Sequence, residues 1–344
     1  GLNEHNTEYS SPVQLPGTTW SEVASGWNNH TVATKTDGTL WTMGENWGGE
    51  LGQNSRTGYS SPIQIPGTTW SKVATSYYNS RAIKTNGTMW SWGYNIKGEL
   101  GVNSNVQYSS PVQIPGTTWA ATKPFAGKWY SCATKTDGTL WVWGNNEYGE
   151  LGQNNTTDYS SPVQIPGTTW GTDLEHKVAG GGQSAVHAAW IKTDGTLWTW
   201  GSNSQGQLGQ NHDDHRSSPV QIPGTTWKST SSMGYASAAT KTDGTLWTFG
   251  MNEYGQLGQN DRTTRSSPTQ IPGTTWDICT TAGNHSTKAL KTDGTMWAWG
   301  RNPSGQLGQN NTVQYSSPVQ IPGTSWYLDG ISSSAQDGFA KKRV

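Results

Sequence analysis

The chain has 344 residues, and its composition excludes several classes of protein. Charged residues make up 13% and the formal net charge is −1, without the clustered Lys and Arg that bind nucleic acid, so we expect no nucleic-acid partner. No stretch approaches 18 consecutive apolar residues and no charged, then apolar segment opens the chain, so we expect neither a membrane-spanning helix nor an uncleaved signal peptide. Two cysteines, Cys132 and Cys279, are too few for a disulfide framework.

The first element of each repeat is a strand that begins near the phrase Ser-Ser-Pro. This phrase occurs seven times at spacings of 49 to 57 residues, and each copy continues into Pro-Gly-Thr-Thr/Ser-Trp. In the copy at 162–166, Pro-Val-Gln-Ile-Pro alternates apolar and polar residues, which is typical of a strand. We expect seven repeat units, which start near Ser10, Ser60, Ser109, Ser160, Ser217, Ser266 and Ser316.

Three more strands follow in each unit, at 20–24, 31–36 and 39–43 in the first copy. Asp37-Gly38 between the last two predicts a type I′ hairpin, because that turn needs a positive φ at both central residues. The phrase Lys-Thr-Asp/Asn-Gly-Thr-Leu/Met-Trp occurs six times and leads into Gly-x-Asn-x-x-Gly-Glu/Gln-Leu-Gly. No helical period of 3.6 residues appears.

Four-stranded units of about 50 residues, each with a fixed Trp and Gly pattern, indicate the blades of a β-propeller. We therefore expect one all-β domain over 1–344: a seven-bladed β-propeller of four-stranded antiparallel blades, wedged by tryptophans, of which 13 of the 21 lie at repeated positions. The seventh unit is partial. After Trp326, Ala340-Lys341-Lys342 stands where the other units have Thr-Lys-Thr before the Asp-Gly turn, and no such turn follows in this sequence. N- and C-terminal segments should close the ring in one incomplete, three-stranded blade.

A family resemblance rests on the repeated string at 200–209, Trp-Gly-x-Asn-x-x-Gly-Gln-Leu-Gly, which follows an Asp-Gly turn. The string resembles the repeat of the regulator of chromosome condensation family, over essentially the whole chain. The resemblance implies a seven-bladed propeller, and the near-identical, Trp-rich units place the chain nearer the bacterial and viral members. Other members include a nucleotide exchange factor for a small GTPase and a secreted enzyme inhibitor, so the resemblance implies no single activity.

Differences between the units point to one face of the propeller. Only the interval from Trp to Lys changes, from 14 to 22 residues, whereas the intervals around the turns are constant. In an antiparallel meander the variable loops lie on the face opposite the constant turns. Recognition usually uses variable loops on a rigid scaffold, so we expect a ligand-binding face there.

Aromatic, Asn and His side chains in these loops suit a protein or a glycan, through stacking and hydrogen bonds. Any one of the aromatics could instead pack between blades, and Arg81 and Lys288 also fall in this region. The candidate ligand-binding residues are Trp27, Asn29, His30, Tyr77, Tyr78, Trp129, Tyr130, His187, Tyr235 and His285.

Catalytic and metal chemistry find little support in the sequence. His212-Asp213-Asp214-His215 is the densest group of potential metal ligands, but four adjacent residues converge poorly on one ion, so we expect a solvated loop, no metal and no cofactor. The repeated Asp residues are explained by turn geometry, and the repeated Lys residues should cover apolar surface or form pairs near the turns. No nucleophile and base recur together, so we expect no enzyme activity.

Two functional hypotheses remain. The first is a non-enzymatic recognition or structural propeller that binds a protein or glycan, outside a cell, at the cell surface or on a virion, without membrane insertion and within a larger complex. The alternative is a regulatory, protein-binding propeller, either an enzyme inhibitor or a small-GTPase nucleotide exchange factor.

Overall fold

The computed structural model describes residues 15, 17–26, 28–120, 125–127, 129–171, 178–179, 186–282, 285–327 and 341–342. Within these ranges the chain forms strands, turns and loops, and no helix is present. The structure divides into two compact units, residues 1–145 with 158–164 and residues 146–157 with 165–344. They are described in turn.

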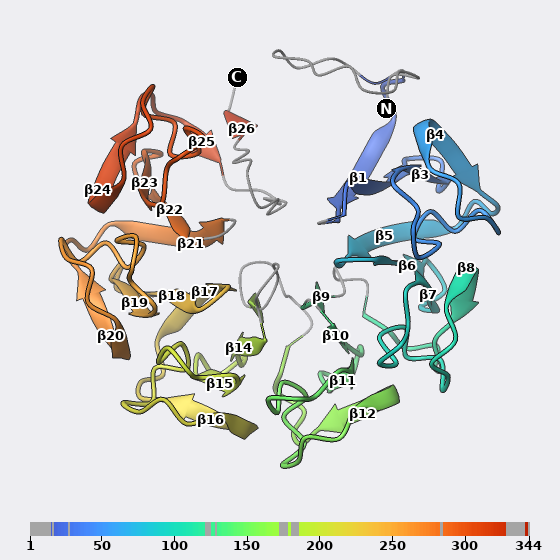
Figure 1. Cartoon of the computed structure of the whole chain (residues 1–344), viewed down its shortest axis with the longest axis horizontal. Helices are drawn as coiled ribbons and strands as arrows, with labels where there is room; N and C mark the ends of the chain where they lie inside the picture. The colour runs from blue at the N-terminus through green and yellow to red at the C-terminus, as the bar shows by residue number, and fades with distance from the viewer. Residues whose placement is uncertain are drawn as a thin grey trace. The chain divides into compact units, whose positions relative to one another are not determined.

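Unit 1 contains sheets made of strands that follow one another in the chain (Figure 1). The strands are β1 (Trp20–Ser25), β2 (His30–Lys35), β3 (Leu40–Gly44) and β4 (Tyr59–Ile65); β5 (Trp70–Thr75), β6 (Asn79–Lys84), β7 (Met89–Gly93) and β8 (Tyr108–Gln113); and β9 (Phe125–Ala126), β10 (Tyr130–Thr134), β11 (Leu140–Gly144) and β12 (Tyr159–Ile165), whose last residue is assigned to unit 2.

Unit 2 repeats this arrangement. Its strands are β13 (Val178–Ala179), β14 (His187–Ile191), β15 (Leu197–Gly201) and β16 (Arg216–Ile222); β17 (Trp227–Met233), β18 (Ala236–Lys241), β19 (Leu246–Gly250) and β20 (Arg265–Ile271); β21 (Trp276–Ala282), β22 (Ser286–Lys291), β23 (Met296–Gly300) and β24 (Tyr315–Ile321); and the pair β25 (Trp326–Tyr327) and β26 (Lys341–Lys342). The described residues therefore form six four-stranded sheets and one two-stranded sheet.

The position of the Ser-Ser-Pro strand differs from the prediction. We expected it to open each blade, but it closes the sheet formed by the three strands before it: Ile65 of β4 is paired with Leu40 of β3. Pro62 explains why this strand lies at the edge of the sheet. Proline has no backbone N–H, so it cannot donate a hydrogen bond to a neighbouring strand and is tolerated at a sheet edge. The sheets are thus offset by one strand from the repeats read in the sequence.

The two ends of each sheet differ, as the meander predicts. Ser25 pairs with Thr31 and Gly44 pairs with both His30 and Tyr59, so the loops 26–29 and 45–58 leave the same end of the first sheet. We call this end, with its equivalents in the other sheets, the loop end. The hairpin at 36–39 and the connection at 66–69 lie at the opposite end, the turn end.

The hairpin at the turn end is not the type I′ turn that the sequence predicted, because Gly38 has a positive φ and Asp37 does not. Gly38 N instead donates to the carbonyl of Lys35, and Lys35 N donates to the carbonyl of Thr39. Asp37 Oδ1 accepts hydrogen bonds from the backbone N–H and the Oγ1 of Thr39, at 3.0 and 2.7 Å, and Trp41 Nε1 donates to Thr39 Oγ1 at 2.8 Å. Lys35 Nζ lies 4.2 Å from the Trp41 ring centroid and 4.8 Å from that of Trp20. The other repeated lysines are Lys84, Lys135, Lys192, Lys241 and Lys291, and each also lies over two Trp rings. The repeated lysines therefore make cation–π contacts.

Tryptophan side chains fill the space between neighbouring sheets, as expected. Val32 and Leu40 of the first sheet pack in one buried cluster with Trp70 and Trp92 of the second. The same arrangement recurs in unit 2, where Leu246 and Ile271 pack with Trp276 and Trp299. Cys132 and Cys279 are buried free thiols.

The glycine-rich motif holds the loop that follows each third strand. Asn46 Nδ2 donates to the carbonyls of Ser55 and Thr57, and Asn46 Oδ1 accepts from Leu51 N, so one side chain closes the loop. The carbonyl of Glu50 in this loop then accepts Trp92 Nε1 of the next sheet at 2.8 Å. The motif is therefore scaffold.

The expected closure of the ring lies outside the described residues, because the predicted N-terminal strand falls within residues 1–14. The short pair β25–β26 is the described part of the partial seventh unit. The number of seven blades and the single domain over 1–344 stay predictions.

Candidate protein-interaction surface

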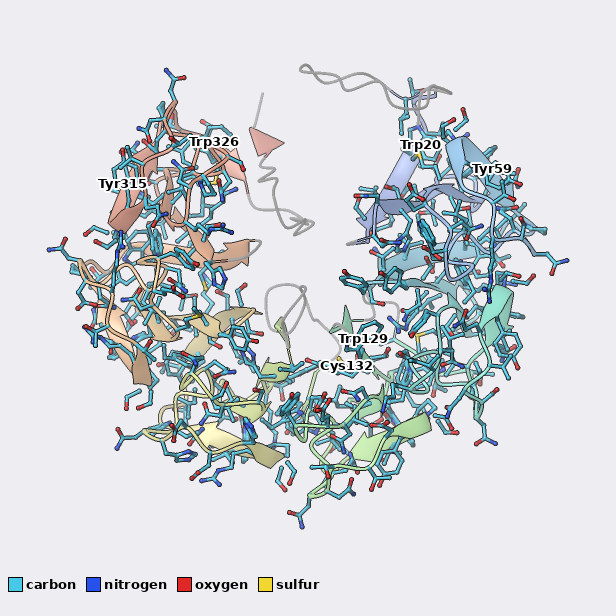
Figure 2. The ribbon with its side chains drawn as sticks, in the orientation of Figure 1. Trp20, Tyr59, Trp129, Cys132, Tyr315 and Trp326 are labelled. Atoms are coloured by element: carbon cyan, nitrogen blue, oxygen red, sulfur yellow. The ribbon has the colours of Figure 1, made fainter. Side chains whose placement is uncertain are left out.

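Four aromatic rings gather at the loop end of unit 1. Tyr77 and Tyr78 lie between β5 and β6, Tyr94 follows β7, and Trp129 precedes β10 (Figure 2 labels Trp129). The Trp129 ring centroid lies 5.7 Å from that of Tyr77, 6.2 Å from that of Tyr78 and 5.6 Å from that of Tyr94. All four side chains are half-buried, so part of each ring reaches the surface. We call these four residues the aromatic cluster.

Tight backbone geometry positions the two adjacent tyrosines. Ser76 N donates to the carbonyl of Asn79 at 2.9 Å, and Ser76 Oγ donates to Asn79 Oδ1 at 2.6 Å, so Tyr77 and Tyr78 occupy the tip of a closed turn. The carbonyl of Tyr78 accepts Tyr94 N at 3.0 Å, which fixes the third ring beside them. Side chains held by such contacts lose less conformational entropy on binding than side chains on a flexible loop.

Buried carboxylates lie near the cluster. Glu50 is fully buried, and its Oε2 accepts Gly48 N at 2.6 Å while its Oε1 accepts Asn28 Nδ2 at 3.3 Å. Burial raises the pKa of Glu50, against the opposing effect of these hydrogen bonds. The pKa of Tyr78 is raised by burial first, then by Tyr77 and the negative charge of Glu50.

Glu99 occupies the equivalent position in the next repeat, and it lies near a buried cation. Burial raises the pKa of Glu99 to about 7, although the charge of Arg81 opposes the shift. Arg81 is itself fully buried: its guanidinium donates to the carbonyl of Glu99 at 2.9 Å and to Ser131 Oγ, and lies 6.0 Å from the Trp143 ring centroid. Arg81 of β6 therefore connects two neighbouring sheets through its contacts with Ser131 and Trp143. It does not lie on the loop surface, where the sequence suggested it.

Three candidate ligand-binding residues lie inside the packing. Tyr130, His30 and His187 are at most 2% exposed. Each is the first residue of the second strand in its sheet, and a Cβ on Gly26 or Gly127 would lie about 2 Å from the His30 or Tyr130 ring, so these glycines cover the rings. Burial lowers the pKa of both histidines to about 4, so both are neutral at pH 7. These residues do not form part of the accessible surface.

Three of the remaining candidates are accessible, on loops other than those of the aromatic cluster. Asn29 is exposed with φ of 53°, which suits an asparagine in a tight loop. In unit 2, His285 and Tyr235 are half-buried; His285 lies 4.9 Å from the Tyr254 ring centroid, and the Arg301 guanidinium covers that ring at 5.3 Å. Trp27 lies outside the described residues.

Tyr94 is the member of the aromatic cluster that the sequence analysis missed. It occupies the x position of the Gly-x-Asn motif, which we treated as scaffold. The residues at this position differ in every repeat, which was the available signal: Glu45, Tyr94, Asn145, Ser202, Met251 and Arg301.

The candidate metal ligands at 212–215 make hydrogen bonds within their own loop. His212 Nδ1 accepts a hydrogen bond from Asp214 N at 3.2 Å. In another repeat, Asn155 Oδ1 accepts the equivalent hydrogen bond from Thr157 N. His215 Nδ1 accepts Asn203 N at 2.8 Å. Among the residues that the structure describes, no group of three potential ligands could hold a metal ion.

Comparison with known proteins identifies the repeat. The family profile described as "Regulator of chromosome condensation (RCC1) repeat" matches residues 86–134, 137–186, 194–235, 243–287 and 293–328. Relatives include the human probable E3 ubiquitin-protein ligase HERC3, 30% identical over 96 residues (28% of this chain, 9% of that protein). Human protein RCC2 is 36% identical over 97 residues (27% and 17%). The secretion-regulating guanine nucleotide exchange factor of Bos taurus is 34% identical over 82 residues (24% and 17%).

Solved structures extend the similarity to the fold. Human WBSCR16 superimposes with a TM-score of 0.75 at 20% identity, over 95% of this chain and 87% of that one. Yeast RCC1 (Prp20), solved bound to Kap60, gives 0.70 at 19% identity, over 93% and 79%. The expected all-β propeller fold is confirmed. The matched segments span only 2% to 18% of the lengths of the curated relatives.

The expected location outside a cell, at a cell surface or on a virion is wrong. Human RCC2, the secretion-regulating guanine nucleotide exchange factor and yeast RCC1 (Prp20), to which the chain is similar, are intracellular regulators and not components of a cell surface or virion. Low charge and two buried cysteines do not distinguish the compartments, which is why the composition misled. No helix among the described residues is long and apolar enough to cross a membrane.

Proposed function

Because the chain belongs to the regulator of chromosome condensation (RCC1) repeat family, we propose that it is a non-enzymatic regulator that binds a protein partner through the loop end of its sheets. The observation that carries this proposal is the aromatic cluster, in which four half-buried rings from three segments lie within 6.2 Å of a neighbour. Tyr and Trp in such settings are the residues that most often dominate the binding energy of protein interfaces.

Further apolar side chains at the loop end of unit 1 support a protein partner. Trp47 is 74% exposed and Ile96 is 50% exposed, and they occupy the same position in successive repeats. A largely exposed aromatic residue at the same end of the unit as four partly exposed rings is unusual for a surface that faces only water. At the turn end, the Trp of each described hairpin donates to a Thr hydroxyl and lies beneath a Lys ammonium, so these rings are already engaged within the protein.

The relatives suggest which proteins to test first. Prp20p is described with binding properties to Gsp1p and histones, and another relative is named as a guanine nucleotide exchange factor. Regulation of a protein partner is therefore favoured over glycan recognition, for which no relative gives support. Accelerated nucleotide release from a small GTPase is the second candidate function, and a larger complex built on the same loop end is consistent with either.

Binding to Gsp1p and to histones, together with nucleotide release from Gsp1p, tests the proposal with defined proteins. The Tyr77→Ala/Trp129→Ala variant should weaken binding at least about tenfold, as expected when hot-spot rings are truncated. Thr68→Ala/Thr118→Ala, at exposed positions of the turn end of the same unit, is the matched control and should bind like the wild type. Loss of binding in the control with full binding in the ring variant would place the interface elsewhere and refute the proposal.

A further inference from the structure

The chemistry of a partner group can be argued from a comparison of the repeats with one another. Glu50, Glu99 and Glu150 occupy one position of the glycine-rich motif, and Gln207, Gln256 and Gln306 occupy the same position in the later repeats. Each accepts a hydrogen bond from the backbone N–H two residues earlier, for example Gly48 N to Glu50 at 2.6 Å and Tyr254 N to Gln256 at 2.9 Å. The scaffold therefore needs an oxygen acceptor here, and a neutral amide supplies it.

A carboxylate at a position where an amide suffices has an energetic cost, because a buried charge loses its hydration. Glu50 carries this cost while fully buried, with Gly48 N and Asn28 Nδ2 as hydrogen-bond donors. Glu50 Oε2 lies close to the aromatic cluster, because a Cβ on Gly48 would lie 3.3 Å from that oxygen and 3.2 Å from Tyr94 Cβ. The charge of Glu50 also acts on Tyr78. The charge of Glu99 acts likewise on Tyr94, and there Arg81 provides internal compensation. For Glu50, which lies beside the aromatic cluster, the scaffold explains an oxygen acceptor but not a negative charge.

The aromatic cluster and this carboxylate together favour a positive group. Aromatic faces attract cations, most strongly where water is partly excluded, and a nearby carboxylate adds to the attraction. The protein uses the same chemistry internally, since Lys35 lies over two Trp rings, Arg81 lies by Trp143 and Arg301 covers Tyr254. An arginine also stacks on such rings through its planar guanidinium.

We infer that the aromatic cluster, backed by Glu50, binds an arginine side chain presented by the partner protein. This inference rests on the proposed function, since it names the chemistry of the partner at the same surface. A guanidinium would stack on the half-buried rings, while Glu50 stabilises its charge from beneath without a direct, solvent-exposed ion pair.

Two fluorescent peptides provide the test: a Gly/Ser peptide with three arginines, and the same peptide with citrulline, the neutral analogue of arginine. Fluorescence anisotropy on the full chain should show about tenfold tighter binding of the arginine peptide. Glu50→Gln should weaken that peptide several-fold and leave the citrulline peptide unchanged. The later repeats show that Gln fits this position, and a melting temperature equal to or above that of the wild type verifies the fold.

Glu45→Gln is the matched control, because it removes the same charge from an exposed residue bonded to Trp47. It should leave both peptides unaffected. Equal binding of the two peptides, no measurable binding of either, or equal effects of Glu45→Gln and Glu50→Gln would overturn the inference. If Tyr77→Ala/Trp129→Ala still abolishes binding of Gsp1p or histones in that case, the proposed function stands and only the arginine specificity falls.

Discussion

Buried histidines show how a residue that suggests binding can serve the interior. His187 Nε2 lies 2.9 Å from Ser237 Oγ, and the Ser237 hydroxyl also donates to the carbonyl of Gln207. His30 is buried at the corresponding place in unit 1, below Gly26. Because burial disfavours the charged imidazolium, the pKa of each histidine falls from 6.5 to about 4.

These shifts predict a pH dependence of stability. Between pH 6.5 and 4 the unfolded chain binds protons at both positions and the folded chain does not, so the free energy of unfolding falls as the pH is lowered through this window. Each histidine contributes about 3 kcal/mol to the loss at most, at 1.36 kcal/mol per pKa unit. Urea unfolding at pH 7 and pH 4.5 measures the difference.

His30→Asn/His187→Asn is the variant that isolates this effect, because Asn79 fills the same strand position in another sheet. The double variant should show a clearly smaller loss of stability on acidification than the wild type. An unchanged loss would mean that carboxylates, and not these histidines, set the acid sensitivity.

At the level of single residues, the sequence predicted part of the candidate site. Tyr77, Tyr78 and Trp129 form the aromatic cluster, whereas His30, Tyr130 and His187 are buried. Tyr77, Tyr78 and Trp129 lie in the loop before the second strand, whereas each buried residue is the first residue of that strand. Gly26 and Gly127, each a few residues before a buried ring, were the local signal for burial.

The sequence predicted the hairpin at the turn end, but not its turn type. Gly38 has φ of 79°, as the glycine indicated, whereas Asp37 does not have the positive φ that a type I′ turn needs, and its side chain accepts Thr39 N instead. The cation–π contact of Lys35 is a finding that sequence spacing alone could not give, because it depends on two Trp residues from different strands. The Ser-Ser-Pro strand was assigned to the wrong sheet, because hydrogen-bond partners across a turn are not encoded in the repeat length.

The hairpin glycine is expected to be the most sensitive position of this element. A Cβ on Gly244 would lie 2.0 Å from the carbonyl oxygen of Thr274, and its φ is +79°. Gly244→Ala should therefore lower the free energy of unfolding by more than about 2 kcal/mol, since backbone strain and a clash with the backbone add. Thermal and urea unfolding measure this change.

Gly234→Ala separates the two contributions. Gly234 has φ of +59°, but nothing lies within 4 Å of the position of its Cβ. This variant should cost only about 1 kcal/mol, the penalty for an L-residue in the left-handed region. Similar losses for both variants would show that the contact with Thr274 relaxes without cost.

For the whole molecule, the repeats predicted more than any single residue did. Self-similarity indicated sheets of four short strands, the hairpins between them and the tryptophans that pack neighbouring sheets, and the family match and solved structures agree with the fold. Cellular location and partner could not be predicted in this way, because the repeated positions are occupied by scaffold residues. Under the proposed function, the partner is recognised by residues that differ between repeats, and the aromatic cluster is found among them.

The expected single domain over 1–344 makes a prediction about cooperativity. Within each unit, a loop carbonyl of one sheet accepts the indole N–H of the next, as in Glu99 with Trp143 at 2.9 Å and Gln256 with Trp299 at 2.9 Å. The same motif precedes every complete repeat after the first, so each sheet should depend on its neighbour for folding. We expect one unfolding transition in urea, with coincident midpoints for Trp fluorescence and far-UV circular dichroism. Two separated transitions would contradict this prediction. If residues 165–344, expressed alone, then showed only one of the two, the chain would contain two independently folding domains.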